Sequence, residues 1–194
     1  MRRGGNPATG ALVESDEVGL LRQVATGDRL AFETLFRAYF PRLTRFLGRF
    51  SRSPSLIEEI VNDTMLVVWQ KAATFDQSCK VSTWVFAIAY RKALKGMNLS
   101  DDPVDADGAE YEDESGHQPE QELGRRQLRR TVLEALDQLP AAQRVVVALT
   151  YYHEMAYQDI ADIVGCPVNT VKTRMFHARR RLQDTLASER EQSL

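Results

Sequence analysis

YQDIADIVGCPVNTVKTRMFHARRRL, residues 157–182, holds two amphipathic segments separated by a glycine. Gly165 allows a left-handed turn after the first segment, and Pro167 suits the first turn of a second helix. A helix-turn-helix needs a small residue where its helices cross, a glycine in the turn and an apolar anchor on the second helix. Ala161, Gly165 and Val171 supply these at fitting spacing. The stretch therefore predicts a helix-turn-helix.

The second helix of this pair divides into an apolar stripe and a polar face. At about 100° per residue, the stripe that must face the domain core consists of Val168, Val171, Met175, Ala178 and Leu182. The opposite face carries Asn169, Thr173, Phe176, His177 and Arg180, with Lys172 and Arg179 on one flank and Arg174 and Arg181 on the other. Such a face suits a helix that lies in a major groove and grips phosphates on either side. The alternative is a surface helix whose arginines are merely solvated. The glycine turn and the short helix before it favour DNA binding.

The formal net charge of -2 conceals a strong segregation of charge along the chain. Residues 1–96 carry 14 basic and 9 acidic side chains, and residues 125–194 carry 11 and 8. Residues 97–124 carry 10 acidic and no basic side chains, with almost nothing apolar. Because this segment cannot bury enough surface to offset its ordering entropy, we expect a flexible acidic linker over 97–122 between two basic domains.

Both flanking blocks read as helices, because their apolar residues recur at three and four positions and no period-two stretch is bounded by turn residues. The fold class is therefore predicted to be all-α, with two small helical domains. We expect a flexible amino terminus (1–18), a first domain (19–96), a second domain (123–187) and a flexible carboxy terminus (188–194). Expected helices span 28–50 with a bend near Pro41, 55–71, 82–95, 121–138, 141–152, 157–164 and 168–187.

Several classes of protein are excluded by what the sequence lacks. The longest apolar run is far shorter than the roughly 20 residues of a membrane span, and no signal peptide follows the first residues. Cys79 and Cys166 form no CxxC, and the three histidines show no metal-ligand spacing. GxSxG, HExxH, Walker and GxGxxG motifs are missing. We expect a soluble, cytoplasmic protein with no metal, no cofactor, no disulfide and no enzymatic activity.

The segment SLIEEIVNDTMLVVWQK, residues 55–71, is apolar nearly all the way round a helix. One face holds Ile57, Ile60, Val61, Thr64, Val67 and Val68. Met65, Leu66 and Trp69 project on the other, mixed with acidic residues and Asn62. Such a helix is either fully buried or docks to a partner, and the pattern favours neither.

The segment STWVFAIAYRKALK, residues 82–95, places aromatic rings beside cations. Trp84, Ile88, Arg91, Lys92 and Lys95 share one side of the helix. A single-strand platform needs this combination, because bases stack on rings while phosphates are neutralised. In the other interpretation Trp84 belongs to the core and the cations only meet water, and the pattern alone slightly favours that.

Taken together, the two halves resemble the extracytoplasmic-function (ECF) sigma factors of bacterial RNA polymerase, sigma-70 family group IV. The resemblance covers residues 27–96 and about 125–187. It rests on GDRLAFETLFRAYFPRLTRFL, IEEIVNDTMLVVWQKAATFD, STWVFAIAYRKAL and LDQLPAAQRVVVALTYYHEMAYQDIADIVGCPVNTVKTRMFHARRRL, with the acidic linker between the halves. The first domain is thereby similar to sigma region 2 and the second to sigma region 4. The resemblance implies a factor that binds core RNA polymerase, directs it to a restricted set of promoters, assists strand opening and then dissociates.

The resemblance also implies roles for particular residues. The helix of 55–71 would dock on the β′ clamp helices of the polymerase, with Glu59, Asn62, Asp63, Met65 and Trp69 as polymerase-binding residues. The loop 75–83 and the helix from Trp84 would recognise the minus-ten element, with Lys80, Trp84, Arg91, Lys92 and Lys95 as contacts. The second domain would read the minus-thirty-five element through Asn169, Thr170, Lys172, Thr173, Arg174, Phe176, His177 and Arg180.

Three features depart from the family pattern. Members often have asparagine where IAYRKA supplies Tyr90 and Arg91, many continue into a basic run where GMNLSDD turns acidic, and arginine is frequent at the position of His177. The family resemblance further implies contact with the polymerase β flap and inhibition by an anti-sigma factor, and we expect a monomer when free. The alternatives are a sigma-like adaptor that sequesters an anti-sigma factor, and a stand-alone helix-turn-helix transcription regulator.

Overall fold

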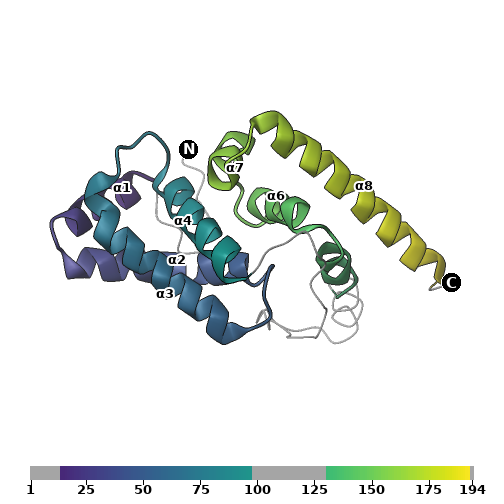
Figure 1. Ribbon diagram of the computed structural model, residues 1–194, viewed down its shortest axis with the longest axis horizontal. Coiled ribbons are helices and arrows are strands. Elements are labelled where there is room, and N and C mark those ends of the chain that lie inside the picture. The colour runs from purple at the N-terminus through teal and green to yellow at the C-terminus, as the bar shows by residue number, and fades with distance from the viewer. Residues whose placement is uncertain (1–13, 98–129, 193–194) are drawn as a thin grey trace, which may run out of the picture.

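The computed structural model describes residues 14–97 and 130–192. Within these ranges every regular element is a helix, which confirms the all-α class. The helices form two groups, one from each half of the chain, that lie side by side in Figure 1. The expected linker, 97–122, and the first part of the expected helix 121–138 fall outside the described residues, apart from Met97.

The amino-terminal group consists of four helices and a short 3-10 turn: α1 (Glu14–Ala25), α2 (Arg29–Leu47), α3 (Pro54–Lys71), the turn Ala72–Thr74 and α4 (Val81–Gly96). The Asp28 carboxylate caps α2 by accepting hydrogen bonds from two backbone amides of its first turn, at 2.8 and 3.2 Å. Ser53 caps α3, and Pro54 occupies its first turn. Helices at these three places were predicted from the sequence, with bounds within three residues of those observed.

Helix α1 corrects one expectation, because it begins at Glu14, inside the segment 1–18 that was expected to be a flexible terminus. It packs along α2 and buries Leu21 and Val24 at 1% and 2% exposure. Glu17 is also buried, and its Oε1 lies 3.0 Å from Nη1 of Arg42 on α2. Burial raises the pKa of Glu17 above its usual range. The buried stripe of α1 consists of Glu17, Leu21 and Val24, and the carboxylate in it interrupts the apolar pattern, so the helix was not predicted.

The carboxy-terminal group comprises a helix over 130–137, α6 (Ala141–Tyr151), α7 (Tyr157–Val164) and α8 (Val168–Gln192). The bounds of α7 are those predicted. Gly165 has φ +70 and donates its amide to the Ala161 carbonyl at 2.9 Å, which confirms the left-handed turn. Helix α8 continues to Gln192, so most of the segment 188–194 expected to be flexible is helical.

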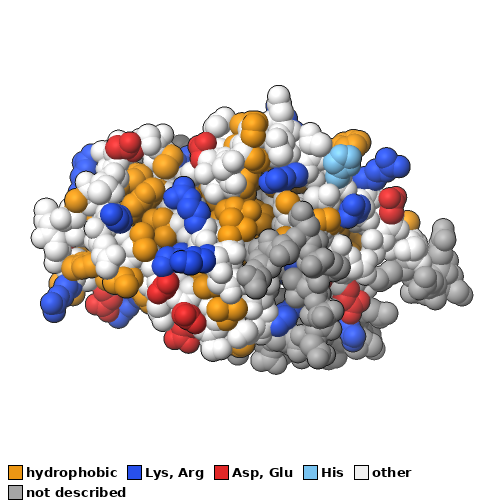
Figure 2. Space-filling view, viewed as in Figure 1, with side chains coloured by type: hydrophobic (Ala, Val, Ile, Leu, Met, Phe, Trp, Pro, Cys, Tyr) orange, Lys and Arg blue, Asp and Glu red, His pale blue; other side chains and the backbone are white. Residues whose placement is uncertain are grey.

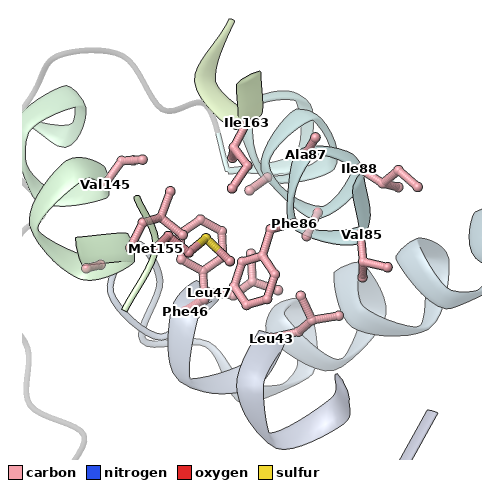
Figure 3. Packing of buried hydrophobic residues seen from close by; sticks show 14 of the residues in the cluster. Leu43, Phe46, Leu47, Val85, Phe86, Ala87, Ile88, Val145, Met155 and Ile163 are labelled. Atoms are coloured by element: carbon pink, nitrogen blue, oxygen red, sulfur yellow. The ribbon is translucent and has the colours of Figure 1, made fainter. Parts of the chain in front are cut away.

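A continuous apolar core joins the two groups. Helix α7 lies directly against α4, and α6 and α7 both pack on α8. Figure 3 shows Met155 and Ile163 of the second group facing Phe46 and Phe86 of the first. All four side chains are at least 92% buried. The two domains are therefore docked on each other.

Candidate nucleic-acid interface and docking groove

Helix α8 is oriented by the apolar stripe predicted for it. Val171, Met175 and Ala178 are buried at 0 to 2% exposure, and Val168 and Leu182 are partly buried against the same core. Because these side chains anchor one side of the helix, the opposite side must point outward. The stripe predicted from the sequence is thus confirmed.

The outward face of α8 we call the recognition face: Asn169, Thr173, Phe176, His177 and Arg180, all of them exposed. Phe176 is 63% exposed, and its ring lies edge-on to that of His177, 5.5 Å between centroids. The Thr173 hydroxyl donates to the Asn169 carbonyl at 2.9 Å. On the face drawn in Figure 2, a histidine and several cationic side chains gather over α8. The face thus presents polar and aromatic groups to solvent.

The flanks of this face carry the remaining cations. Lys172 is exposed, whereas Thr170 and Arg174 are half-buried, and Nη1 of Arg174 lies 3.8 Å from the Cys166 sulfur. Arg179 donates through Nε to the hydroxyl of Tyr151 on α6 at 3.2 Å. Tyr151 was missed in the sequence, since only the fold brings the end of α6 beside α8.

The cations of α4 are arranged differently from those of α8. The Lys80 ammonium is 2.9 Å from a carboxylate oxygen of Asp159 on α7, and this hydrogen bond, with the attraction of the charge, raises the pKa of Lys80. Lys92 is paired with Asp63 of α3 at 2.8 Å. Lys92 was predicted to contact the minus-ten element and Asp63 to contact the polymerase, and in the structure these two side chains form an ion pair with each other.

The other three residues predicted to meet the minus-ten element also lie on α4. Arg91 and Lys95 are exposed, while Trp84 is half-buried with its ring 5.4 Å from that of Phe75. The two interpretations of Trp84 therefore overlap: part of the indole belongs to the core, and part remains accessible next to the loop 75–80. That loop includes Gln77 at φ +61.

An apolar groove of about 530 Å³ runs between α2 and α3. We call it the docking groove. It is lined by Arg29, Phe32, Phe36, Asn62, Met65, Leu66 and Trp69. Leu66 is 52% exposed, and the Trp69 ring stands edge-on to Phe32, with 5.2 Å between centroids. On the second apolar face of α3, Leu66 is thus open to solvent, Trp69 is half-buried and Met65 is buried.

The docking groove contains only part of the residues predicted for polymerase binding. Asn62, Met65 and Trp69 line it, whereas Glu59 and Asp63 are exposed on α3 outside it. Met65 was expected to project outward, but it is 1% exposed and forms the floor, because α3 packs closely on the rest of the core here. Phe32 and Phe36 of α2 were not predicted as part of the site. The apolar residues of the helix expected over 28–50 form a stripe wider than one buried face requires, and this was the available signal.

The contact between the domains brings together polar groups that no local pattern connects. Asp159, in the first turn of α7, accepts hydrogen bonds from Lys80 and from the Thr83 hydroxyl, at 2.9 and 3.2 Å. Arg144 is 1% exposed and donates to the carbonyl of Arg49 across the interface at 3.1 Å. Arg52 pairs with Asp137. The two domains are therefore joined by specific polar contacts in addition to apolar ones.

His153 packs at the contact between the domains. Its imidazole lies against the rings of Phe46 and Phe86, with centroids 6.0 and 4.7 Å away, and these two rings also touch each other, 5.3 Å between centroids. Burial, and then the positive charges of Arg42, Arg45 and Arg49, lower the pKa of His153 from its usual 6.5 to about 4. The imidazole is consequently neutral while the domains are docked at pH 7.

Within the described ranges, no cluster of three or more His, Cys, Asp or Glu side chains could hold a metal ion. None of the described helices is long and apolar enough to cross a membrane.

Two family models match the chain: Sigma-70 region 2 over residues 35–98, and Sigma-70, region 4 over residues 129–182. The chain is 30% identical over 178 residues to the ECF RNA polymerase sigma factor RpoE of Cereibacter sphaeroides, covering 89% of this chain and 96% of the relative. It is 31% identical over 180 residues to the ECF RNA polymerase sigma factor SigK of Mycolicibacterium vanbaalenii, covering 90% and 91%.

Among solved structures, the sigma factor RpoE in complex with the anti-sigma factor NepR from Bartonella quintana is similar, with a TM-score of 0.61 and 27% identity, over 80% of this chain and 96% of that chain. Region 2 followed by region 4 on helical domains defines a sigma factor of the sigma-70 type. Within that class, the chain belongs to the ECF RNA polymerase sigma factors.

Proposed function

We propose that this sigma factor binds core RNA polymerase through the docking groove and places its two DNA-facing helices, α4 and α8, on the promoter. The observation that carries the proposal is the groove itself. Phe32, Leu66 and Trp69 line an apolar hollow on the surface of the first domain, and Leu66 is 52% exposed there. Burying apolar surface is favourable by roughly 25 cal/mol per Å², so a partner that covers these side chains gains binding energy.

The groove suits a helical partner. It follows two adjacent helices, and the polar side chains of Arg29 and Asn62 stand among its apolar lining. An apolar groove with a polar rim is the usual surface on which an amphipathic helix lays its apolar face. We assign the β′ clamp helices of the polymerase to this position, and the β flap to the second domain.

The recognition face of α8 is assigned to the minus-thirty-five element. Asn169 and Thr173 can form hydrogen bonds with base edges, Phe176 can contact a thymine methyl, and the flanking Lys172 and Arg174 can contact phosphates. The loop 75–83 and α4 are assigned to the minus-ten element. There the exposed part of Trp84 offers a stacking surface, and Lys80, Arg91, Lys92 and Lys95 offer phosphate contacts.

Regulation by an anti-sigma protein is part of the proposal. The Bartonella quintana sigma factor similar to this chain was crystallised with its anti-sigma factor NepR. A regulator of this kind would compete with the polymerase for the docking groove. We further propose that the protein acts in the cytoplasm by binding rather than by catalysis, and that it is a monomer when free.

The test is reconstitution with bacterial core RNA polymerase, followed by transcription on genomic fragments. The wild-type protein is expected to give specific initiation that core polymerase alone does not give. Leu66→Glu, which places a charge in the docking groove, should weaken polymerase binding by at least about 100-fold, because a buried unpaired carboxylate costs several kcal/mol. Leu94→Glu is the matched control: Leu94 is 41% exposed on α4, outside the groove, and its replacement should leave polymerase binding unchanged.

Other outcomes would indicate the alternatives. Tight binding to duplex DNA without polymerase, and no initiation, would indicate a stand-alone regulator. Binding to an anti-sigma protein alone, without polymerase binding, would indicate a sequestering adaptor. Equal loss of polymerase binding in both glutamate variants would contradict the assignment of the groove.

A further inference from the structure

Tyr151 and Arg179 form a contact between α6 and α8 at the edge of the recognition face. Nε of Arg179 donates to the Tyr151 hydroxyl at 3.2 Å, and the guanidinium carbon lies 6.0 Å from the centre of the Tyr151 ring. Tyr151 is 57% exposed, and Arg179 is exposed as well. Both side chains are therefore accessible to a large ligand that lies along α8.

The chemistry of this contact leaves hydrogen-bond donors free for an anion. A guanidinium carries five N–H donors, and the contact with Tyr151 uses the one on Nε. A phenol hydroxyl that accepts one hydrogen bond can still donate its own proton. Arg179 forms no ion pair with a carboxylate of the described residues. The free donors of the two side chains suit an anion with several oxygens, such as a phosphate group.

The position of the pair suits the DNA backbone rather than the base edges. Arg179 comes seven residues after Lys172, so these two cations lie on the same flank of α8, about 10 Å apart along its axis. A helix in the major groove has base edges before its outward face and phosphates along its flanks. Helix α6, which ends at Tyr151, packs on α8. The end of α6 thus stands beside the flank that would follow one DNA strand.

We propose that Tyr151 and Arg179 together bind one phosphate of the DNA backbone, with Tyr151 also setting the direction of the guanidinium. We call this pair the phosphate clip. The remaining donors of Arg179 and the hydroxyl proton of Tyr151 meet oxygens of the same phosphate. The inference rests on the proposed minus-thirty-five role of α8. It adds to that role a contact from α6, a helix to which the proposed function assigns no DNA-binding residue.

The neighbouring tyrosine provides a matched control for the test. Tyr151→Phe removes the hydroxyl and keeps the ring. Tyr152→Phe does the same at a residue whose ring centre lies 4.3 Å from the guanidinium carbon of Arg49, in the first domain. The full-length protein is titrated at several salt concentrations with two fluorescently labelled duplexes of unrelated sequence, and affinity is read by fluorescence anisotropy. Circular dichroism reports whether each variant is folded.

The two members of the clip should differ in the salt dependence of their effects. Arg179→Ala is expected to weaken binding severalfold and to lower the slope of log affinity against log salt by about one. Tyr151→Phe should weaken binding about twofold to fivefold on both duplexes, because one hydrogen bond to the backbone is lost. It should leave the slope unchanged, since a phenol carries no charge. Tyr152→Phe should bind both duplexes like the wild type.

The double variant of Tyr151→Phe with Arg179→Ala distinguishes a clip from two separate contacts. In a clip, the loss of the hydroxyl costs less once the guanidinium is gone, so the combined loss of affinity should be smaller than the product of the two single losses. Single losses that simply multiply would overturn the inference. Wild-type affinity in Tyr151→Phe, or an equal loss in Tyr152→Phe, would also overturn it.

The proposed reading of the minus-thirty-five element can fail separately, and Phe176→Ala measures it. In transcription with reconstituted polymerase, this variant should lose initiation at the promoters that the wild type uses. If Phe176→Ala initiates normally while Tyr151→Phe still weakens duplex binding, base reading by α8 is wrong and the clip stands as a backbone contact. If Phe176→Ala fails while Tyr151→Phe binds like the wild type, the clip is wrong and base reading by α8 stands.

Discussion

Helices α4 and α8 both carry cations to the surface, yet the surroundings of these cations differ. Lys80 and Lys92 beside and on α4 are paired with Asp159 and Asp63, whereas Arg91 and Lys95 of α4 and Lys172, Arg180 and Arg181 of α8 have no ion pair among the described residues. Helix α4 is also buried along most of its length, while α8 is anchored by a single stripe. The cationic surface of α4 is thus partly compensated within the protein, and that of α8 is open to a partner.

The largest expected difference between the two helices is in stability. Phe86 of α4 is 0% exposed, and its replacement by alanine should lower the free energy of unfolding by about 3 to 5 kcal/mol. Phe176 of α8 is 63% exposed, and Phe176→Ala should change the free energy of unfolding by less than about 0.5 kcal/mol. Urea denaturation followed by circular dichroism measures both. Similar losses would contradict the contrast between a core helix and a surface helix.

Acidification should lower the free energy of unfolding through His153, which packs against α2 and α4. The pKa of His153 is lowered to about 4 when the domains are docked, so the docked state holds the neutral imidazole. Its contribution to stability is complete above pH 6.5 and is lost as the pH falls towards about 4, at about 1.4 kcal/mol per pH unit. The measurement is the free energy of unfolding between pH 7 and pH 4.

The control for this prediction is the other described histidine. His153→Phe keeps a ring packed against Phe46 and Phe86 but cannot be protonated, so the slope of the free energy of unfolding against pH should flatten. His177→Phe changes an exposed residue on α8 and should leave the slope as it is. If the free energy of unfolding of His153→Phe falls with pH as steeply as that of the wild type, another group is responsible for the loss of stability at low pH.

The affinity of α8 for duplex DNA should fall as the salt concentration rises. Removing the exposed Lys172 should reduce affinity for a minus-thirty-five duplex severalfold and lower the slope of log affinity against log salt by about one. Lys95→Ala removes the same charge from an exposed position on α4 and should leave this slope unchanged. The comparison is made by anisotropy titrations at several salt concentrations. Equal effects of both variants would mean that binding is non-specific and not centred on α8.

The smallest expected effect is at the pair of Asp63 and Lys92. Their side chains are 51% and 36% exposed, so solvent screens most of the attraction. A double-mutant cycle with Asp63→Asn and Lys92→Met should give a coupling energy below about 1 kcal/mol. A value above about 2 kcal/mol would indicate that the pair is a structural link between α3 and α4.

Much of the fold was predictable because it follows from local periodicity. The stripe of α8, the bounds of α7 and the turn at Gly165 are consequences of side chains three or four positions apart. Helix α1 was not predicted, since its few buried apolar residues give a weak pattern. The exposure of the recognition face followed from the stripe, whereas the roles of its residues at the promoter remain predictions.

The contacts between the domains could not be predicted from the sequence. Asp159 meets Lys80 over a separation of 79 positions, and His153 enters a pocket formed by α2 and α4. No helical period connects such positions, and the acidic segment between them permits many geometries. The burial of Met65 has the same origin, because it depends on how closely α3 packs on the rest of the first domain.

The proposed function requires the two domains, which pack on each other through α4 and α7, to separate when the protein lies on both promoter elements. Spin labels at Gln23→Cys on α1 and Gln183→Cys on α8, both exposed positions, allow the interdomain distance to be measured by pulsed electron spin resonance after Cys79 and Cys166 are replaced by serine. The account predicts one short, narrow distance distribution in the free protein and an increase on the order of tens of Å with polymerase and promoter DNA. A broad, long distribution in the free protein, or a distance that polymerase and promoter leave unchanged, would contradict it.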